Sequence, residues 1–246
     1  MLRFECCLQM APTTIRENLA RVREQIADSA SRARRNANEI TLIGVSKTQP
    51  AEAIREAFEA GLRHFGENRV QEWEGKRSGV ADLAGTTWHL IGHLQSNKAA
   101  KAARLFRTID AVDDFALAQR LARATNESSP AAKLRVLIEV HLGGEESKSG
   151  VTEAGLPELA EKVKRLADLE LAGLMSIPPY LPDPEQVRPY FARLRELRNQ
   201  TEARLGQLLP VLSMGMSHDF AAAILEGATE VRIGTAIFGA RSAVAK

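Results

Sequence analysis

A lysine at the end of an apolar run has a position that suits covalent chemistry. Lys47 follows the stretch TLIGVS (41–46) and stands three residues before Pro50. At the opening of a mostly apolar interior the charged form of a lysine is disfavoured, so its pKa can fall. A neutral amine can attack an aldehyde and form an imine. The alternative, from the residues alone, is a solvated lysine in a loop.

A second group of residues suits an anion. The stretch SMGMSHD (213–219) offers the hydroxyls of Ser213 and Ser217 around a glycine, just ahead of a predicted helix. The first amides of a helix and the positive end of its dipole favour a phosphate. Gly234 and Thr235 add close backbone approach and a further hydroxyl. The alternative is that Ser217 caps its helix and Gly234 turns the chain.

The two groups together indicate a ligand that carries both an aldehyde and a phosphate. Pyridoxal phosphate has both, since its aldehyde bonds to a lysine while its phosphate is held separately. A Schiff-base lyase acting on a phosphorylated sugar would use the same parts. The residues alone leave both possibilities open.

The elements that must position these groups alternate regularly along the chain. Short apolar runs, uniformly apolar as in strands buried on both faces, are separated by longer amphipathic segments. The expected strands are 41–46, 63–66, 88–92, 108–112, 134–142, 169–176, 211–214 and 231–238. The expected helices are 13–37, 52–60, 70–76, 97–104, 114–124, 153–167, 185–205 and 219–226.

This pattern predicts a single-domain (β/α)8 barrel of the TIM type with an extra N-terminal helix. About 250 residues is typical of such a barrel, and the chain has 246. The rival is an open doubly wound sheet, whose dinucleotide-binding version is disfavoured because no G-x-G-x-x-G follows the first strand. We expect residues 13–246 to form the barrel and residues 1–12 to be a flexible extension. Thr14 and Glu17 are spaced as a capping box for the first helix.

A barrel gathers its functional groups where strands end, and the loops after the last two strands often hold a phosphate. Lys47 and the two phosphate-binding stretches occupy such positions. At this point the residues also resemble a known family, the pyridoxal phosphate homeostasis proteins, which are similar to the N-terminal domain of alanine racemase. The resemblance spans roughly residues 13 to 241. The matching stretches are VSKTQP, HFGENRVQE, WHLIGHLQSNK, GEESKSG, GLMSIPP, SMGMSHD and VRIGTAIFGAR.

The resemblance implies that pyridoxal 5'-phosphate forms a Schiff base with Lys47. It also implies six further cofactor-binding residues, with Ser217, Gly234 and Thr235 holding the phosphate and Arg232 near the pyridine nitrogen or the phosphate. The full set is Lys47, Asn68, Ser213, Ser217, Arg232, Gly234 and Thr235. Two positions depart from the family pattern: His141 stands where asparagine is usual, and Asp110 stands where histidine is common.

The same resemblance implies a carrier or regulator in vitamin B6 homeostasis, with apo forms of pyridoxal-phosphate enzymes as recipients, and no robust turnover of its own. An arginine at the ring nitrogen supports this, because it does not readily give up a proton. Racemisation would need a second base, which related racemases take from a further domain that we expect this chain to lack. Tyr180 is the internal candidate for that base, but we favour a packing role. A weak amino-acid racemase remains the alternative function.

Composition excludes several other classes. The net charge is +2 with mixed signs, so nothing favours nucleic acid or an anionic membrane. No apolar stretch approaches the roughly 20 residues of a membrane helix. Cys6 and Cys7 are the only cysteines, which fits a reducing cytoplasm, and they do not have the spacing of a cysteine metal-binding motif. We also expect a monomer.

Overall fold

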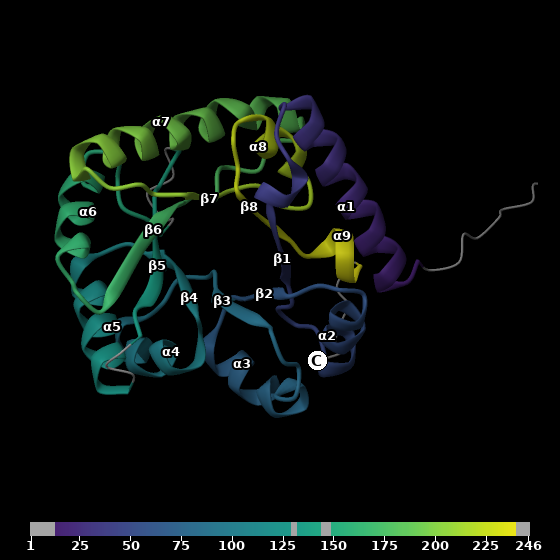
Figure 1. The fold of residues 1–246 in the computed structure, drawn as a ribbon, viewed down its shortest axis with the longest axis horizontal. Helices are drawn as coiled ribbons and strands as arrows, with labels where there is room; N and C mark the ends of the chain where they lie inside the picture. The colour runs from purple at the N-terminus through teal and green to yellow at the C-terminus, as the bar shows by residue number, and fades with distance from the viewer. Residues whose placement is uncertain (1–12, 129–131, 144–148, 240–246) are drawn as a thin grey trace, which may run out of the picture.

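Eight parallel strands close into a barrel with a ring of helices outside it (Figure 1). The computed structural model describes residues 13–128, 132–143 and 149–239. Each strand pairs with its successor, and β1 pairs with β8 to close the sheet. The strands are β1 Thr41–Val45, β2 His64–Glu67, β3 Thr87–Leu90, β4 Thr108–Val112, β5 Leu134–Glu139, β6 Leu169–Met175, β7 Val211–Ser213 and β8 Glu230–Ile233. The barrel and the helix that precedes its first strand confirm the predicted fold.

The helices lie outside the barrel in space (Figure 1); in sequence, one α-helix precedes β1, one follows β8 and the others lie between successive strands. Four short 3₁₀ segments, labelled η, accompany them among the described residues. The α-helices are α1 Ile15–Arg32, α2 Ala51–Glu59, α3 Val70–Arg77, α4 Ala99–Leu105, α5 Phe115–Ser128, α6 Leu156–Lys164, α7 Arg188–Leu205, α8 Phe220–Leu225 and α9 Thr235–Phe238. The 3₁₀ segments are η1 Ala37–Glu39, η2 Ser78–Val80, η3 Ser96–Lys98 and η4 Pro184–Val187.

Helix α1 begins as predicted and is tied to the end of the barrel. The Thr14 hydroxyl accepts from the Glu17 amide and the Glu17 carboxylate accepts from the Thr14 amide, which is a capping box. One face of α1 is apolar and buried, while Asn18 donates to the carbonyl of Ile237 in α9 at 3.0 Å. The helix therefore packs against α8 and α9, the helices on either side of the last strand, and helps to fix the segment that follows it.

The apolar core has an outer and an inner part. Alternate strand residues belong to the large cluster shared with the helices. The residues between them, on β4 to β7, form a small separate cluster of Ala111, Leu137, Ala172, Met175 and Val211. Because successive side chains of a strand point to opposite faces, this small cluster lies inside the barrel. The same alternation along β5, β7 and β8 places four polar side chains in the interior: Glu139, Ser213, Glu230 and Arg232.

The predicted strand over 231–238 is wrong in its second half. β8 ends at Ile233, Gly234 turns the chain with φ −109° and ψ −78°, and Thr235–Phe238 form α9. The short apolar sequence AIF fits a strand or a helix equally well, so the pattern could not separate them. The predicted strand 134–142 is also shorter than expected, since only an isolated bridge between Val140 and Val151 continues β5.

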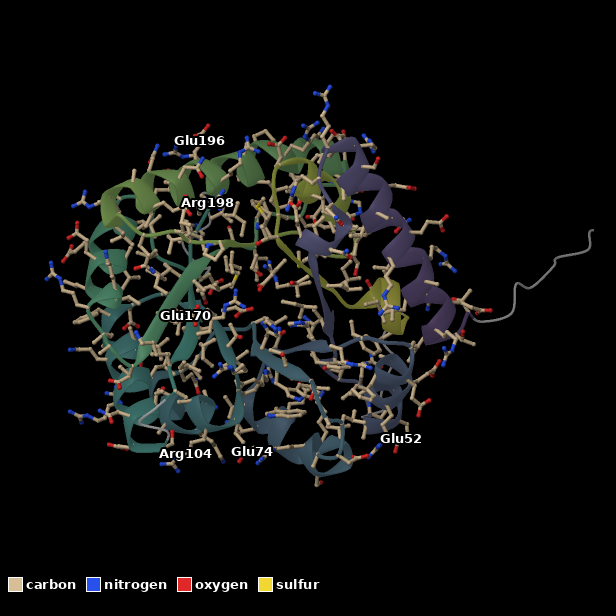
Figure 2. All side chains as sticks on the ribbon, viewed as in Figure 1. Glu52, Glu74, Arg104, Glu170, Glu196 and Arg198 are labelled. Atoms are coloured by element: carbon tan, nitrogen blue, oxygen red, sulfur yellow. The ribbon has the colours of Figure 1, made fainter. Side chains whose placement is uncertain are left out.

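The outer face of the helix ring is polar. The labelled side chains of Glu52, Glu74 and Arg104 lie on this rim (Figure 2). Within the described part of the chain, no helix is both long enough and apolar enough to cross a membrane. The predicted extension 1–12, with Cys6 and Cys7, lies outside the described residues.

Candidate functional site

Lys47 lies where the sequence placed it, in the turn directly after β1, and its side chain is half-buried. A Cβ on Gly44 would meet Leu62 and Phe238 on the helix side of the strand. Ile43 and Val45 therefore face the barrel interior. Lys47 follows Val45 by two residues, in the turn at this end of the barrel.

A buried ion pair supports the turn that carries Lys47. The Lys76 ammonium on α3 donates to the Ser46 carbonyl at 2.7 Å and lies 2.8 Å from Oε1 of Glu67 at the end of β2. The Ser46 hydroxyl donates to the same carboxylate at 2.6 Å. Glu72 accepts from the Thr48 amide and pairs with Lys76 at 3.2 Å. We call Ser46, Glu67, Glu72 and Lys76 the turn support.

The turn and the turn support contain two unfavourable features that other interactions have to offset. Thr48 has a φ of 63°, in the left-handed region that non-glycine residues rarely adopt. Burial raises the pKa of Glu67, while Lys76 and Ser46 oppose that rise. A buried carboxylate stays ionised only beside a positive partner. Lys76 therefore stabilises the charged form of Glu67, and its bond to the Ser46 carbonyl also stabilises the turn.

The two predicted phosphate-binding stretches are joined through one hydroxyl. The Ser217 Oγ accepts from the amides of Gly234 and Ala236, each at 3.3 Å. Thr235 lies between these amides and is exposed, and it begins α9. The structure thus brings Ser217, Gly234 and Thr235 together. Backbone amides and hydroxyls converging at a loop are groups that bind an oxyanion.

This pair of loops lies beside Lys47. Gly44 of β1 is in register with Ile233 of β8, and a Cβ on Gly234 would stand 3.4 Å from the Cβ of Val45. Lys47 and Gly234 therefore follow neighbouring strands at the same end of the barrel. A ligand reaching both would bridge the ends of β1 and β8.

The loop after β7 is shaped by a glycine and an aspartate. Gly215 has a φ of +93°, and a Cβ there would come within 2.6 Å of the Ala223 Cβ. The Met216 amide donates to Asp219 Oδ1 at 2.6 Å. Burial raises the pKa of the Asp219 carboxyl. These contacts fix the backbone that presents Ser217.

Arg232 faces the barrel interior, two residues before the turn at Gly234. Its guanidinium donates to the Ser213 hydroxyl and to the Ser176 carbonyl, both at 2.8 Å. Burial lowers the pKa of Arg232, and the nearby carboxylates of Asp110 and Glu139 oppose that shift. Ser213 and Arg232 are thus brought together, below the loops rather than on them.

Asn68 lies at the barrel mouth, in the loop directly after β2. It lines a cavity of about 360 Å³ that it shares with Glu139, His93, His141 and Ile177, among others. A Cβ on Gly92 would clash with the Asn68 carbonyl at 2.6 Å, so the loops after β2 and β3 approach closely here. The mouth therefore has a partly polar wall formed by residues after β2, β3 and β5.

Glu139 is a residue of this mouth that the sequence did not single out. It ends β5 on the interior face, and its Oε2 has no hydrogen-bond partner among the described residues. Burial, reinforced by the charge of Asp113, raises the pKa of Glu139 to about 7. The available signal was a lone carboxylate in the apolar run LRVLIEV.

Tyr180, the candidate second base, is a largely solvent-exposed loop residue. Its side chain is 73% exposed in the loop after β6, and its ring lies 5.1 Å from that of His218. Trp73 and Trp88, by contrast, stack at 3.7 Å in the outer core. Part of the glycine-rich loop GEESKSG lies outside the described residues.

Comparison with known proteins gives consistent matches over nearly the whole chain. The family described as alanine racemase, N-terminal domain, matches residues 15–242. A pyridoxal phosphate homeostasis protein of Aquifex aeolicus is 47% identical over 225 residues, which cover 92% of this chain and 97% of that protein. One from Pseudomonas aeruginosa is 48% identical over 229 residues, covering 93% and 96%.

A solved structure extends the match to three dimensions. PipY of Synechococcus elongatus, determined with PLP bound, superimposes with a TM-score of 0.81 at 40% identity. The match covers 92% of this chain and 100% of PipY. The same fold and a similar sequence therefore accompany a bound cofactor in a relative.

Proposed function

The chain belongs to the family of pyridoxal phosphate homeostasis proteins, and we propose that it binds pyridoxal 5'-phosphate through a Schiff base on Lys47. We further propose that it acts as a carrier or regulator of this cofactor, without robust catalysis. The observation that carries the proposal is the placement of Lys47 beside the Ser217–Gly234 loops, at the same end of the barrel. PipY, which contains PLP, supports the choice of ligand.

The residues present fit the cofactor's chemical groups. Ser217, Gly234 and Thr235 would bind the phosphate through hydroxyls and amides. The Lys47 amine would bond to the aldehyde carbon with release of one water. Arg232 with Ser213, and Asn68 across the mouth, would line the ring. When bound, the group supplies a conjugated system that can accept electrons from an attached amino acid.

The interior arginine argues for a carrier. A guanidinium stays protonated in a protein, so Arg232 cannot pass a proton to a ring nitrogen. Its two Nη atoms already donate to Ser213 and Ser176, which fixes its orientation. Beside this arginine the ring nitrogen would stay unprotonated, so the ring would accept electrons from an attached amino acid less well. Amino-acid turnover would therefore be slow.

One observation favours a second function, weak amino-acid racemisation. Glu139 lies in the mouth cavity with Asn68, and its raised pKa lets it hold or accept a proton near neutrality. It is a better placed acid–base group than Tyr180. The two functions share the cofactor site and differ in whether a substrate proton is exchanged.

Two measurements separate the functions. The loaded protein is mixed with an apo enzyme that requires the cofactor, and recovered enzyme activity reports transfer. The loaded protein is also incubated with single amino-acid enantiomers in deuterated water, and mass spectrometry reports deuterium at Cα. The carrier proposal predicts transfer faster than from free cofactor at equal concentration, with negligible deuterium uptake.

The opposite pair of results would favour the racemase. Rapid deuterium uptake that falls in Glu139→Gln, together with no transfer advantage, would establish the racemase and overturn the carrier. The proposal places the exchange in the cytoplasm, between a monomeric protein and apo enzymes.

A further inference from the structure

We propose that the barrel holds a divalent transition-metal ion at the end opposite Lys47, bound by His89, Asp110 and Glu230. His89 is the third residue of β3, Asp110 the third of β4 and Glu230 the first of β8. Glu230 opens β8, and His89 lies 3.1 Å from His64, which opens β2, whereas Lys47 follows a strand end. We call the three side chains the floor site.

The floor site is compact and dry. One ligand atom from each residue lies within 4.8 Å of the other two. The exposed fractions are 0% for His89 and Asp110 and 3% for Glu230. A metal ion with bonds of about 2 Å needs ligand atoms a few ångströms apart, so small side-chain movements would complete the coordination.

Unpartnered polar atoms gather around the same point. Among the described residues, eight buried side-chain atoms lack a hydrogen-bond partner, and four belong to this end of the barrel. Two are ligand-type oxygens, Asp110 Oδ1 and Glu230 Oε2. The others are Thr108 Oγ1 and Arg135 Nε, whose backbones are in register with each other. A buried carboxylate oxygen without a donor costs free energy, and a cation removes that cost.

Contacts at both ring nitrogens fix the orientation of the His89 imidazole. His89 Nε2 lies 3.1 Å from Nδ1 of His64, and His89 Nδ1 lies 3.3 Å from Asp110 Oδ2. The ring nitrogen of His64 therefore partners His89 Nε2. This leaves His89 Nδ1 directed at the carboxylates. A metal-bound histidine generally has its other nitrogen held in this way.

Positively charged side chains also face the floor site, and a bound metal ion would have to compete with them for the carboxylates. Arg135 Nη1 lies 3.8 Å from Glu230 Oε1, and Arg232 approaches from one interior layer above. A metal ion in the floor site would therefore compete with Arg135 for the Glu230 carboxylate.

The ligand set selects a class of metal. One imidazole and two carboxylates suit zinc, cobalt, manganese or ferrous iron better than calcium or magnesium, which favour oxygen-only sites. Entry would pass His64 and Arg135, which are half-buried at the strand starts. Since the floor site shares no residue with the proposed cofactor site, the two proposals stand separately.

Zinc binding by the full-length protein tests the proposal. We would replace Cys6 and Cys7 by serine in all samples, because adjacent thiols can bind zinc themselves. After dialysis against a chelator, zinc is added and bound metal is measured by mass spectrometry of the metal and by calorimetry. The proposal predicts one zinc per chain, and an affinity lowered at least about tenfold in Glu230→Gln and Asp110→Asn.

Glu170→Gln is the matched control, because this carboxylate also lies near a strand start, on β6, but is exposed (Figure 2). It should bind zinc as the parent does. Absence of stoichiometric zinc in the parent, or equal affinity in Glu230→Gln, would overturn the proposal and leave bound water as the partner of the orphan atoms. If the variants do not fold, a zinc-soaked crystal decides: the anomalous peak must lie between His89 and Glu230.

Discussion

Glu139 is the residue whose protonation most directly links the barrel mouth to pH. Burial and Asp113 raise its pKa to about 7, above the ordinary carboxyl value of 4.5. The folded state therefore binds this proton more tightly than the unfolded chain does. The stability gained from the neutral acid is complete below pH 4.5 and is lost as the pH rises through about 7.

The first prediction is that Glu139→Gln stabilises the protein at alkaline pH. The amide keeps the shape and removes the buried charge, so the free energy of unfolding at pH 8 should rise by on the order of 1–3 kcal/mol. The gain should shrink towards pH 5. Urea unfolding at both pH values measures it.

Glu170→Gln serves as the control, since this side chain is exposed. Its free energy of unfolding should change little at either pH. A Glu139→Gln protein that is less stable than the parent at pH 8 would mean that the charged carboxylate is compensated, and the account of the mouth would be wrong.

At the scale of elements, helix α3 determines how β1 presents Lys47. Lys76 reaches from α3 to the Ser46 carbonyl and to Glu67, so the turn support joins three elements. The second prediction is that Lys76→Met destabilises the protein by about 3–5 kcal/mol, because Glu67 is left buried without its partner. Chemical denaturation measures the loss.

A double variant checks the cause. Lys76→Met with Glu67→Gln should recover much of the stability, since no uncompensated charge remains. Lys101→Met is the control, because its pair with Glu74 is exposed and such pairs contribute about 0–1 kcal/mol. A double variant no more stable than Lys76→Met would show that the ion pair is not the cause.

The loop between β7 and α8 has its own requirement. The third prediction is that Gly215→Ala lowers stability by more than about 1 kcal/mol and weakens cofactor binding, because the added Cβ meets Ala223 and Phe220 at a positive φ. Gly85→Ala is a close control: its φ is +78°, but nothing lies within 4 Å of the added Cβ. Cofactor titration and thermal unfolding measure both variants. If the two variants lost the same stability and the same cofactor affinity, backbone strain alone would explain the loss, and the contact with Ala223 and Phe220 would not matter.

The elements themselves were largely predictable, for a physical reason. Strands covered on both faces are apolar throughout, so each stood out against amphipathic helices. The failure over 235–238 arose because a four-residue apolar segment has no periodicity to distinguish helix from strand. Its helical state depends on Gly234 and on the contact of α1 with Ile237, which are tertiary facts.

At the scale of the whole molecule, barrel topology explains which site residues could be foreseen. Lys47, Ser217 and Gly234 follow strand ends, and parallel strands in a barrel bring all their ends together. The floor site could not be foreseen, because it combines single polar residues from three apolar strands. Asp110 drew attention only as a departure from a family pattern.

The fourth prediction concerns assembly. Among the described residues, the exposed large hydrophobic side chains are Ile177, Tyr180 and Leu208. Stable interfaces are marked by large continuous apolar patches, and three exposed apolar side chains contribute little apolar surface. We therefore expect a monomer. Light scattering after gel filtration should give the mass of one chain at micromolar concentration, and a dimer mass would contradict this.

The central claim is that Lys47 holds the cofactor covalently, and trapping that bond tests it most directly. Protein loaded with pyridoxal phosphate is reduced with borohydride, digested and mapped by mass spectrometry. We predict the added pyridoxyl phosphate mass on the peptide carrying Lys47, at one per chain, and its loss in Lys47→Ala. A label on another lysine, such as Lys98 beside the cavity lined by Asn68 and His93, or no stable label at all, would contradict the account.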